Sequence, residues 1–145
     1  MNRSITMSVV SALLLSLAVG CSSGPNFKEA SAKFPQLAPS QGRIFFYRAG
    51  SMFGAGIQPD INLNNEHVGN SNPGLFFYVD RPAGNYVVSC STEAEHKLTF
   101  TLTPQETKYV RTSVTMGLFV GQVFPTLEDK DTAMQTLGDC SCAQR

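Results

Sequence analysis

The sequence predicts a mostly β protein, an antiparallel β-sandwich of about seven or eight short strands with one short helix near the C-terminus. Three observations predict this class. From residue 42 onward, short apolar or alternating segments recur at close spacing, and turn-forming residues separate most of them. No strand–helix–strand rhythm interrupts these segments, which favours antiparallel pairing. Within residues 42–145, helical features are confined to one segment near the C-terminus, residues 128–137.

The expected strands are short, and local patterns support them. The segment 97–102 places leucine and phenylalanine on one face and mainly threonine on the other, which is the two-residue period of a half-buried strand. Asn64 and Asn65 suit a two-residue hairpin turn because asparagine tolerates positive φ. The expected strands cover residues 43–48, 60–63, 66–68, 75–79, 86–91, 97–102, 108–114 and 118–124.

The expected helix, residues 128–137, carries signals at both ends. Glu128, Asp129 and Asp131 place negative charge in its first turn, where the helix dipole favours it, and Gly138 can end it. We expect this helix to pack near the C-terminal end of the sandwich.

The N-terminus has the pattern of a signal peptide followed by a lipidated cysteine. Arg3 precedes an apolar run, residues 5–19, of about 15 residues, whereas a membrane-spanning helix needs roughly 20. The run ends in Ala-Val-Gly-Cys at 18–21, a lipobox in which small residues allow cleavage before a cysteine that receives diacylglyceryl. We expect residues 1–20 to be removed and Cys21 to carry acyl chains such as palmitate. The alternatives are a secretory signal with a chance cysteine and an uncleaved anchor.

Residues 21–41 are expected to form the lipidated cysteine and a flexible tether, and residues 42–145 the sandwich domain with its helix and cysteine-containing tail. The tether holds three prolines and four serines and lacks strand alternation. Phe27 and Phe34 fall at helical spacing, so one amphipathic turn is compatible, resting on the domain or on the lipid surface. Ser22, in place of the aspartate that favours inner-membrane retention, points to the outer membrane facing the periplasm.

The charge balance argues against two classes of partner. Without residues 1–20, the chain has ten basic and eleven acidic side chains. A nearly neutral surface disfavours nucleic acid, whose binding depends on neutralising many phosphates. It also provides no polybasic patch for anionic lipid head groups. The lipid at Cys21 is therefore the expected membrane attachment.

The sequence lacks the patterns of common active sites. No serine lies in a Gly-x-Ser-x-Gly elbow, and no glycine run has the spacing of a phosphate loop. His67 and His96 fall in a hairpin arm and a polar turn, where solvated histidines are common. We expect no enzymatic activity, no cofactor, no metal site and no small-molecule substrate.

Three cysteines remain besides Cys21. Cys90 lies in an alternating strand segment and is expected to point inward, whereas Cys140 and Cys142 follow the expected helix. In an oxidising envelope, a disulfide from Cys90 to Cys140 or Cys142 would hold the tail on the sandwich and leave one thiol over. The alternatives are pairing between molecules and a redox or metal role for the C-terminal pair, for which a lone Cys-x-Cys is weak evidence.

Two glycine-containing segments, residues 50–57 and 116–121, are unusually apolar. If both lie at one end of the sandwich, they form an exposed patch and a possible partner surface. If they are bulged strands, their side chains pack in the core and glycine permits the bends, which is the interpretation we favour. The side chains concerned are Met52, Phe53, Ile57, Met116, Leu118 and Phe119.

Five short motifs occur in a characteristic order. They are Gly-Arg-Ile-Phe-Phe-Tyr-Arg at 42–48, a strand–turn–strand unit at 61–69, Gly-Leu-Phe-Phe-Tyr at 74–78, Pro-Ala-Gly-Asn-Tyr at 82–86 and Lys-Tyr-Val-Arg at 108–111. In this order, they resemble a family of small bacterial lipoproteins known by the domain of unknown function 2846. The resemblance implies a lipid-anchored sandwich domain and no established activity, and it does not extend to the C-terminal cysteines.

Three functions are compatible with these patterns. The first is a non-catalytic binding or accessory domain that is anchored by lipid and holds an envelope protein partner near the membrane. The second is a structural envelope component that self-associates, with the leftover thiol as one means of doing so. The third, a thiol redox or metal-binding protein, would depend on Cys140 and Cys142.

Overall fold

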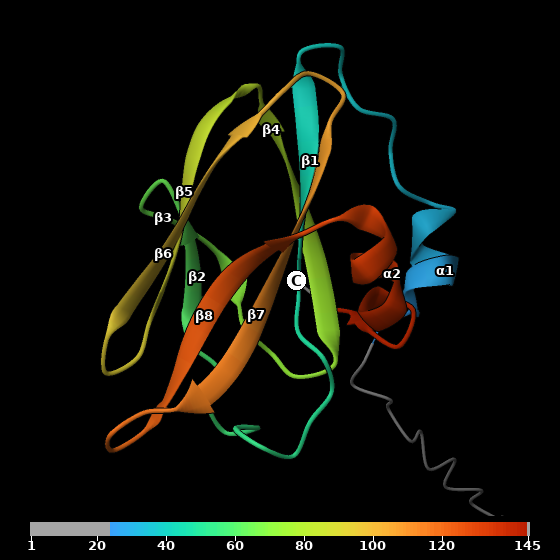
Figure 1. Cartoon of the computed structure of the whole chain (residues 1–145). Helices are drawn as coiled ribbons and strands as arrows, with labels where there is room; N and C mark the ends of the chain where they lie inside the picture. The colour runs from blue at the N-terminus through green and yellow to red at the C-terminus, as the bar shows by residue number, and fades with distance from the viewer. Residues whose placement is uncertain (1–23, 145) are drawn as a thin grey trace, which may run out of the picture.

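A computed structural model describes residues 24–144 as two β-sheets packed face to face, with two short helices on one side (Figure 1). The mostly β sandwich predicted from the sequence is confirmed. Its elements in chain order are α1 (Phe27–Ser31), β1 (Gln41–Tyr47), β2 (Asp60–Leu63), β3 (Glu66–Asn70), β4 (Leu75–Pro82), β5 (Gly84–Ser91), β6 (Glu95–Leu102), β7 (Thr107–Met116), β8 (Gly121–Glu128), α2 (Lys130–Leu137) and β9 (Ser141–Cys142).

One sheet has the strand order β8-β7-β1-β4-β9 and the other β3-β2-β5-β6. Five pairings are antiparallel, as expected, and three of them join strands that follow each other in the chain. Two pairings are parallel, β1 with β7 and β4 with β9. Parallel neighbours need a long connection, and here the chain passes through the opposite sheet or through α2 before it returns. Local sequence patterns do not report such distant pairings.

The central strand, β1, is buried on both faces, which explains its continuous apolar run. Ile44 and Phe46 point between the sheets into the main core, where both are fully buried. Phe45 and Tyr47 point to the other face, into a second apolar cluster beneath the helices. Strands covered on both sides lose the alternation that marks a half-buried strand.

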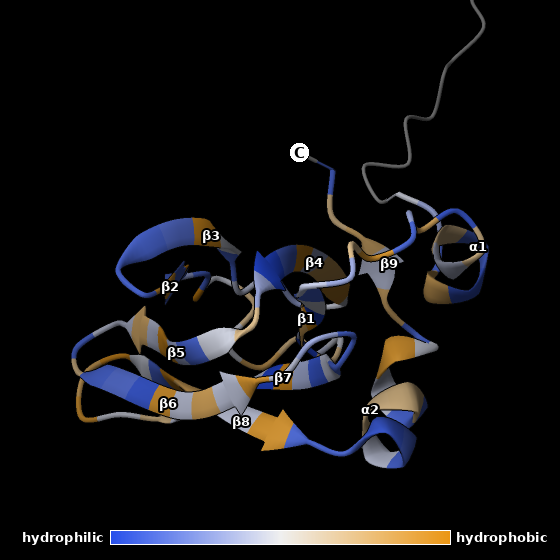
Figure 2. Cartoon of the chain, turned by 90° about the horizontal axis from the view of Figure 1, so that it is seen from above, coloured by the Kyte–Doolittle hydropathy of each residue, from blue (hydrophilic) through white to orange (hydrophobic). Residues whose placement is uncertain are grey.

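The two helices cover the outer face of the five-stranded sheet, and Figure 2 shows both on the same side of the molecule. Asn26 caps α1 by accepting a hydrogen bond from the Glu29 amide, and Asp129 caps α2 in the same way through Thr132. The expected C-terminal helix is therefore present, beginning two residues later than predicted. Neither helix in residues 24–144 has the length and apolarity that crossing a membrane requires.

The described part of the expected tether, residues 24–40, lies along the domain. Phe27 packs edge-on against Phe76 at 5.2 Å between ring centroids, and Phe34 lies 4.7 Å from the ring of Tyr78. The backbone carbonyl of Pro35 accepts a hydrogen bond from Arg43. Of the two placements open for the amphipathic turn, the structure shows the one on the domain.

Besides shifts of one to four residues at other strand ends, the structure differs from the expected strands at the start of β8 and near the C-terminus. β8 begins at Gly121, so residues 118–120 belong to the turn after β7 instead of to a strand. β9 was not expected, because a two-residue strand has no periodic pattern. The predicted signal peptide, Cys21 and Ser22 lie outside the described residues.

Candidate binding surfaces

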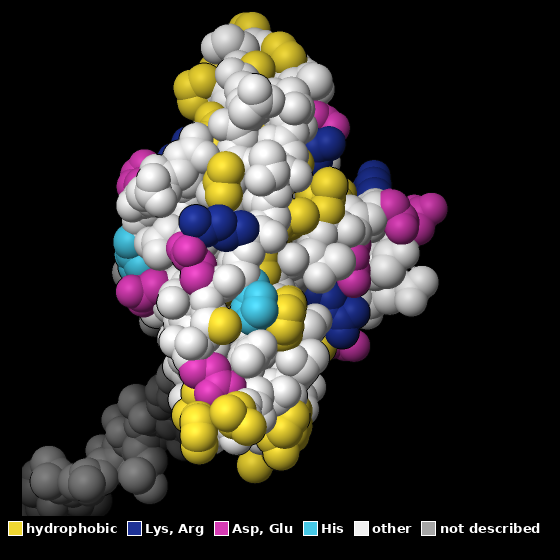
Figure 3. Space-filling model, turned by 60° about the vertical axis from the view of Figure 1, so that its left-hand side comes forward, with side chains coloured by type: hydrophobic (Ala, Val, Ile, Leu, Met, Phe, Trp, Pro, Cys, Tyr) yellow, Lys and Arg dark blue, Asp and Glu magenta, His cyan; other side chains and the backbone are white. Residues whose placement is uncertain are grey.

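The two apolar segments lie together at one end of the sandwich. The β1–β2 connection and the β7–β8 turn emerge at the same end (Figure 1), and a Cβ added to Gly54 would contact the side chain of Val114 in β7. Hydrophobic side chains gather there on the surface (Figure 3). We call this surface the apolar tip, and its residues are Met52, Phe53, Met116, Leu118, Phe119 and Val120.

The favoured expectation of core packing is wrong for most of the apolar tip. Leu118 is 82% exposed and Phe119 is 88% exposed, although both are large apolar side chains. Ile57 behaves as first expected, because it packs on the main core and lies next to Gly121. Leu118, Phe119 and Val120 lie in the turn beyond Met116 and Gly121, the last paired residues of β7 and β8, and so outside the space between the two sheets.

A buried arginine organises the first loop of the apolar tip. Arg48 is 4% exposed and donates hydrogen bonds to the backbone carbonyls of Gly54 at 2.7 Å, Ile57 at 2.6 Å and Ser71 at 3.0 Å. Burial lowers the pKa of its guanidinium. These bonds fold the connection of residues 49–59 back on itself and satisfy its carbonyl groups.

A carboxylate from the opposite sheet organises the second loop. Glu93, in the β5–β6 turn, accepts hydrogen bonds from the backbone amides of Leu118 at 2.6 Å and Phe119 at 3.2 Å. Desolvation raises the pKa of Glu93, but hydrogen bonds from Gln122 and from the backbone of residues 118–120 outweigh it and hold the pKa below its ordinary value. Gly117 is required there, because a Cβ at this position would collide with the backbone carbonyl of Val120 as well as with the Glu93 carboxylate.

Two further carboxylates have lowered pKa values. Hydrogen bonds from Lys108 and Thr103 lower the pKa of Glu106, and bonds from Thr132 lower that of Asp129 at the α2 N-cap. A carboxylate whose pKa is lowered by folding stabilises the protein above its unfolded pKa, and this contribution disappears as the pH falls through the folded pKa. The ordinary values are 4.5 for glutamate and 3.8 for aspartate.

We therefore expect the free energy of unfolding to be level above about pH 6 and to fall progressively below about pH 4.5. Urea titrations across this range, followed by far-ultraviolet circular dichroism, measure the slope of the free energy of unfolding against pH. Substituting Glu93→Gln, Glu106→Gln and Asp129→Asn together should make this slope shallower. A slope that is the same in this triple variant would contradict the assignment.

A groove of about 690 Å³ opens where β3 and β4, from the two sheets, lie beside the N-terminal segment and the C-terminal tail. Its floor includes the buried side chains of Phe77 and Val79, and its rim carries His67, Asp80 and Arg81. We call it the β3–β4 groove. Its lining residues are Pro35, His67, Val68, Phe77, Tyr78, Val79, Asp80, Arg81, Cys142 and Ala143.

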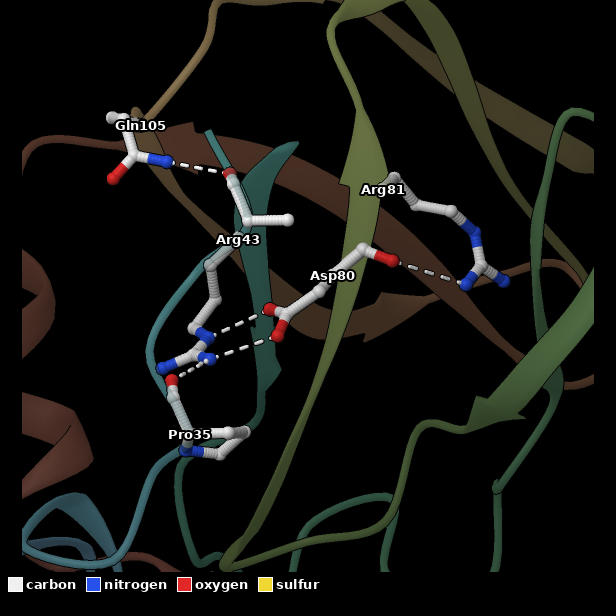
Figure 4. Close-up of polar contacts among 6 residues, drawn as sticks. Pro35, Arg43, Asp80, Arg81 and Gln105 are labelled. Carbon is white, nitrogen blue, oxygen red and sulfur yellow. Dashed lines mark hydrogen bonds and ion pairs between the residues drawn. The ribbon is translucent and has the colours of Figure 1, made fainter. Parts of the chain in front are cut away.

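One wall of the β3–β4 groove is held by a buried ion pair (Figure 4). Arg43 donates from Nε and Nη2 to the two carboxylate oxygens of Asp80, at 2.7 and 2.8 Å, and Nη2 also bonds Pro35. The guanidinium lies 4.5 Å from the centre of the Tyr78 ring. The hydrogen bond that Arg43 donates to Asp80 raises the pKa of Arg43, although burial opposes it. The N-terminal segment is thereby fixed against β1 and β4; at its other end, Gln105 donates to the carbonyl of Ala38.

The expected disulfide is not seen, and the three described cysteines are free thiols. Cys90 lies in the main core between the sheets, whereas Cys140 and Cys142 pack with the second cluster on the outer face of the five-stranded sheet. A sheet therefore separates Cys90 from both possible partners, and a disulfide needs Cα atoms within about 7 Å. Burial raises the pKa of Cys90 to about 12 and that of Cys140 to about 11. Both thiols are therefore poor nucleophiles at neutral pH.

The histidines lie apart. His67 pairs with Asp60 at 3.5 Å on the surface, and His96 bonds Gln122 and lies against the ring of Phe124. Among residues 24–144, no three histidine, cysteine, aspartate or glutamate side chains come close enough to hold a metal ion.

Several organising residues were not singled out by sequence reasoning. Glu93 acts on a loop 25 residues away in the chain, and Arg48 bonds carbonyls of the irregular loop that follows it, so no spacing rule reveals either role. Val120 belongs to the apolar tip but was assigned to a strand. Arg43 and Asp80 lie in strands that are far apart in the sequence, so no local pattern indicates that they form an ion pair.

The comparisons with known proteins gave one match. Residues 38–123 match the model of the family described as "Protein of unknown function (DUF2846)". The match therefore covers β1 to β7 and the start of β8, and leaves out α1, α2 and the C-terminal cysteines. No curated protein and no solved structure matches the chain.

Proposed function

The chain belongs to the DUF2846 family, and from its own residues we propose that it is a bacterial lipoprotein anchored by lipid at Cys21. Its sandwich is a non-catalytic binding domain in the cell envelope. The lipid anchor is supported by the lipobox at residues 18–21, whose cysteine lies three positions before Gly24, where the chain joins the domain. Two or three acyl chains would hold the protein on a membrane, since each buried CH₂ contributes about 0.8 kcal/mol. Ser22 favours the outer membrane, facing the periplasm.

The anchor is tested by membrane fractionation of the full chain and mass spectrometry of its N-terminal peptide. We expect the wild-type protein to enter the membrane fraction with a peptide that starts at Cys21 and carries acyl mass. The Cys21→Ala variant should lack the acyl mass and the cleavage before residue 21. Cys142→Ala is the matched control, because it removes another thiol that is not fully buried and should leave both unchanged. An unmodified wild-type peptide would refute the lipoprotein assignment.

We place the binding activity in the β3–β4 groove. Its apolar floor and charged rim have the anatomy of protein interfaces, in which an apolar centre is surrounded by polar side chains. The Arg43–Asp80 pair fixes one wall, so the groove is formed before a partner arrives. The expected partner is a segment of an envelope protein.

The test is photo-crosslinking in intact cells with a photoreactive amino acid at His67, on the groove rim. Thr99, an exposed residue on β6, is the control position in the same sheet. We expect a discrete crosslinked protein from position 67 and none from position 99. Equal labelling from both positions, or none from either, would remove the groove as a binding site. A crosslink only to another copy of this chain would favour the self-associating envelope component instead.

A further inference from the structure

The apolar tip lies at the end of the domain where the described chain begins. The backbone amide of Gly24 donates to the carbonyl of Cys142 at 3.1 Å, in strand β9. β9 lies beside the first residues of β4, and the amide of Ser141 donates to the carbonyl of Gly74. Gly74 in turn bonds Arg48, where the first tip loop leaves β1. The point of entry and the tip thus share one end of the five-stranded sheet.

The reach of the anchor is short. Two residues, Ser22 and Ser23, lie between Cys21 and Gly24, and these three steps along the chain span at most about 11 Å. A lipid on Cys21, which is the premise taken from the proposed function, therefore holds this end of the domain against the membrane. Residues 24–40 are packed on the sheet and therefore add no length to the connection between the lipid and the domain.

The composition of the tip suits the interface of a bilayer. Residues 49–59 and 114–122 contain no charged side chain, and five of the six tip side chains are Met, Leu or Phe. Aromatic and aliphatic side chains of this kind enter the boundary between head groups and acyl chains to a depth of about 5–10 Å. With no lysine or arginine in either loop, attraction to anionic lipid does not contribute from these residues.

Several polar backbone groups of the two loops have hydrogen-bond partners within the protein. Glu93 accepts the amides of Leu118 and Phe119, and Arg48 donates to carbonyls of the first loop. Arg48 does so from a buried position, whereas Glu93 is an exposed carboxylate beside the second loop. A surface that enters lipid needs such internal partners, because unpaired backbone groups cost several kcal/mol in hydrocarbon.

We propose that the apolar tip inserts into the membrane that carries the Cys21 lipid, as a second, non-covalent attachment. Together the lipid and the tip would fix the orientation of the sandwich. The long axis then stands away from the bilayer, and the β3–β4 groove faces sideways into the surrounding space.

The chain contains no tryptophan, which permits a direct test. Tryptophan is introduced singly in the full-length lipidated protein as Phe119→Trp or Phe53→Trp, one in each tip loop. The matched control is Leu127→Trp, because Leu127 is also an exposed apolar residue of the β7–β8 pair but lies toward the other end of β8. The proteins are reconstituted into vesicles of phosphatidylethanolamine and phosphatidylglycerol, with or without brominated phosphatidylcholine.

We expect emission from positions 119 and 53 to shift to shorter wavelength in vesicles and to be quenched by the brominated lipid, while position 127 is unaffected. Raised salt should leave the quenching unchanged. Emission from positions 119 and 53 that is insensitive to brominated lipid would overturn the proposal. A blue shift that depends on protein concentration and not on lipid would also overturn it, because it would indicate that a second copy of the chain covers the tip.

Vesicle flotation in the same samples separates this proposal from the proposed function. Protein that floats with the vesicles but shows no quenching retains the lipid anchor and contradicts only tip insertion. Protein that does not float lacks the anchor, and the proposed function fails with it. Circular dichroism of each variant confirms that the sandwich is folded.

Discussion

Replacing Asp80 by alanine should lower the free energy of unfolding by about 3 kcal/mol, because it leaves the Arg43 guanidinium buried without its counter-charge. The side chain of Arg43 is 9% exposed and that of Asp80 is 21% exposed, so water can replace the lost carboxylate only in part. The two bonds are parallel and charge-assisted, which is the strong geometry for such a pair. Urea unfolding followed by circular dichroism measures the change.

A double-mutant cycle identifies the cause of this loss. Removing both charges, as in Arg43→Met with Asp80→Leu, should recover much of the stability, since apolar side chains of similar size often replace a buried ion pair at little cost. If the double variant is less stable than either single variant, the two residues stabilise the fold independently and the pair is not the cause. The exposed pair Arg81–Glu66 is the matched control, and Glu66→Ala should change stability by less than about 1 kcal/mol.

Replacing Arg48 by methionine should lower the free energy of unfolding by about 3 kcal/mol and loosen the first loop of the apolar tip. Methionine fills the space of the aliphatic part of the side chain but donates no hydrogen bond. Three backbone carbonyls, two of them in residues 49–59, then lose a charged donor. Each buried acceptor left without a partner costs about 1–3 kcal/mol, and relaxation of the loop toward water recovers part of that.

Two measurements distinguish the loop from the fold as a whole. Limited proteolysis under native conditions should cut Arg48→Met within residues 49–59 faster than wild type, while the β7–β8 turn remains as resistant as before. Arg48→Lys should show an intermediate loss of stability, because an ammonium reaches fewer of the three carbonyls than the planar guanidinium does. Wild-type stability in Arg48→Met would show that the carbonyls find other donors, and the organising role of Arg48 would be abandoned.

Much of the sandwich could be predicted because its signals are local. The alternation in β6 and the asparagine pair between β2 and β3 each act over a few neighbouring residues, and Asn64 and Asn65 do adopt positive φ. The acidic first turn of α2 and its Asp129 cap are likewise local. The lipobox is a local pattern as well, read from four consecutive residues, and it remains a prediction.

The tertiary structure decided which apolar side chains are covered and which functional groups meet. Phe46 and Phe119 are the same residue type in apolar segments, yet one lies between two sheets and the other extends beyond the last paired residues of β7 and β8. Cys90 and Cys140 both point inward, but a sheet stands between them. By itself, the sequence indicated the strands other than β9, the C-terminal helix with its end signals, and the pattern at residues 18–21. Burial and pairing depend on where distant segments pack. Arg43 meets Asp80 only when β1 and β4 pair within one sheet, and Glu93 meets residues 118–119 only when the two sheets come together.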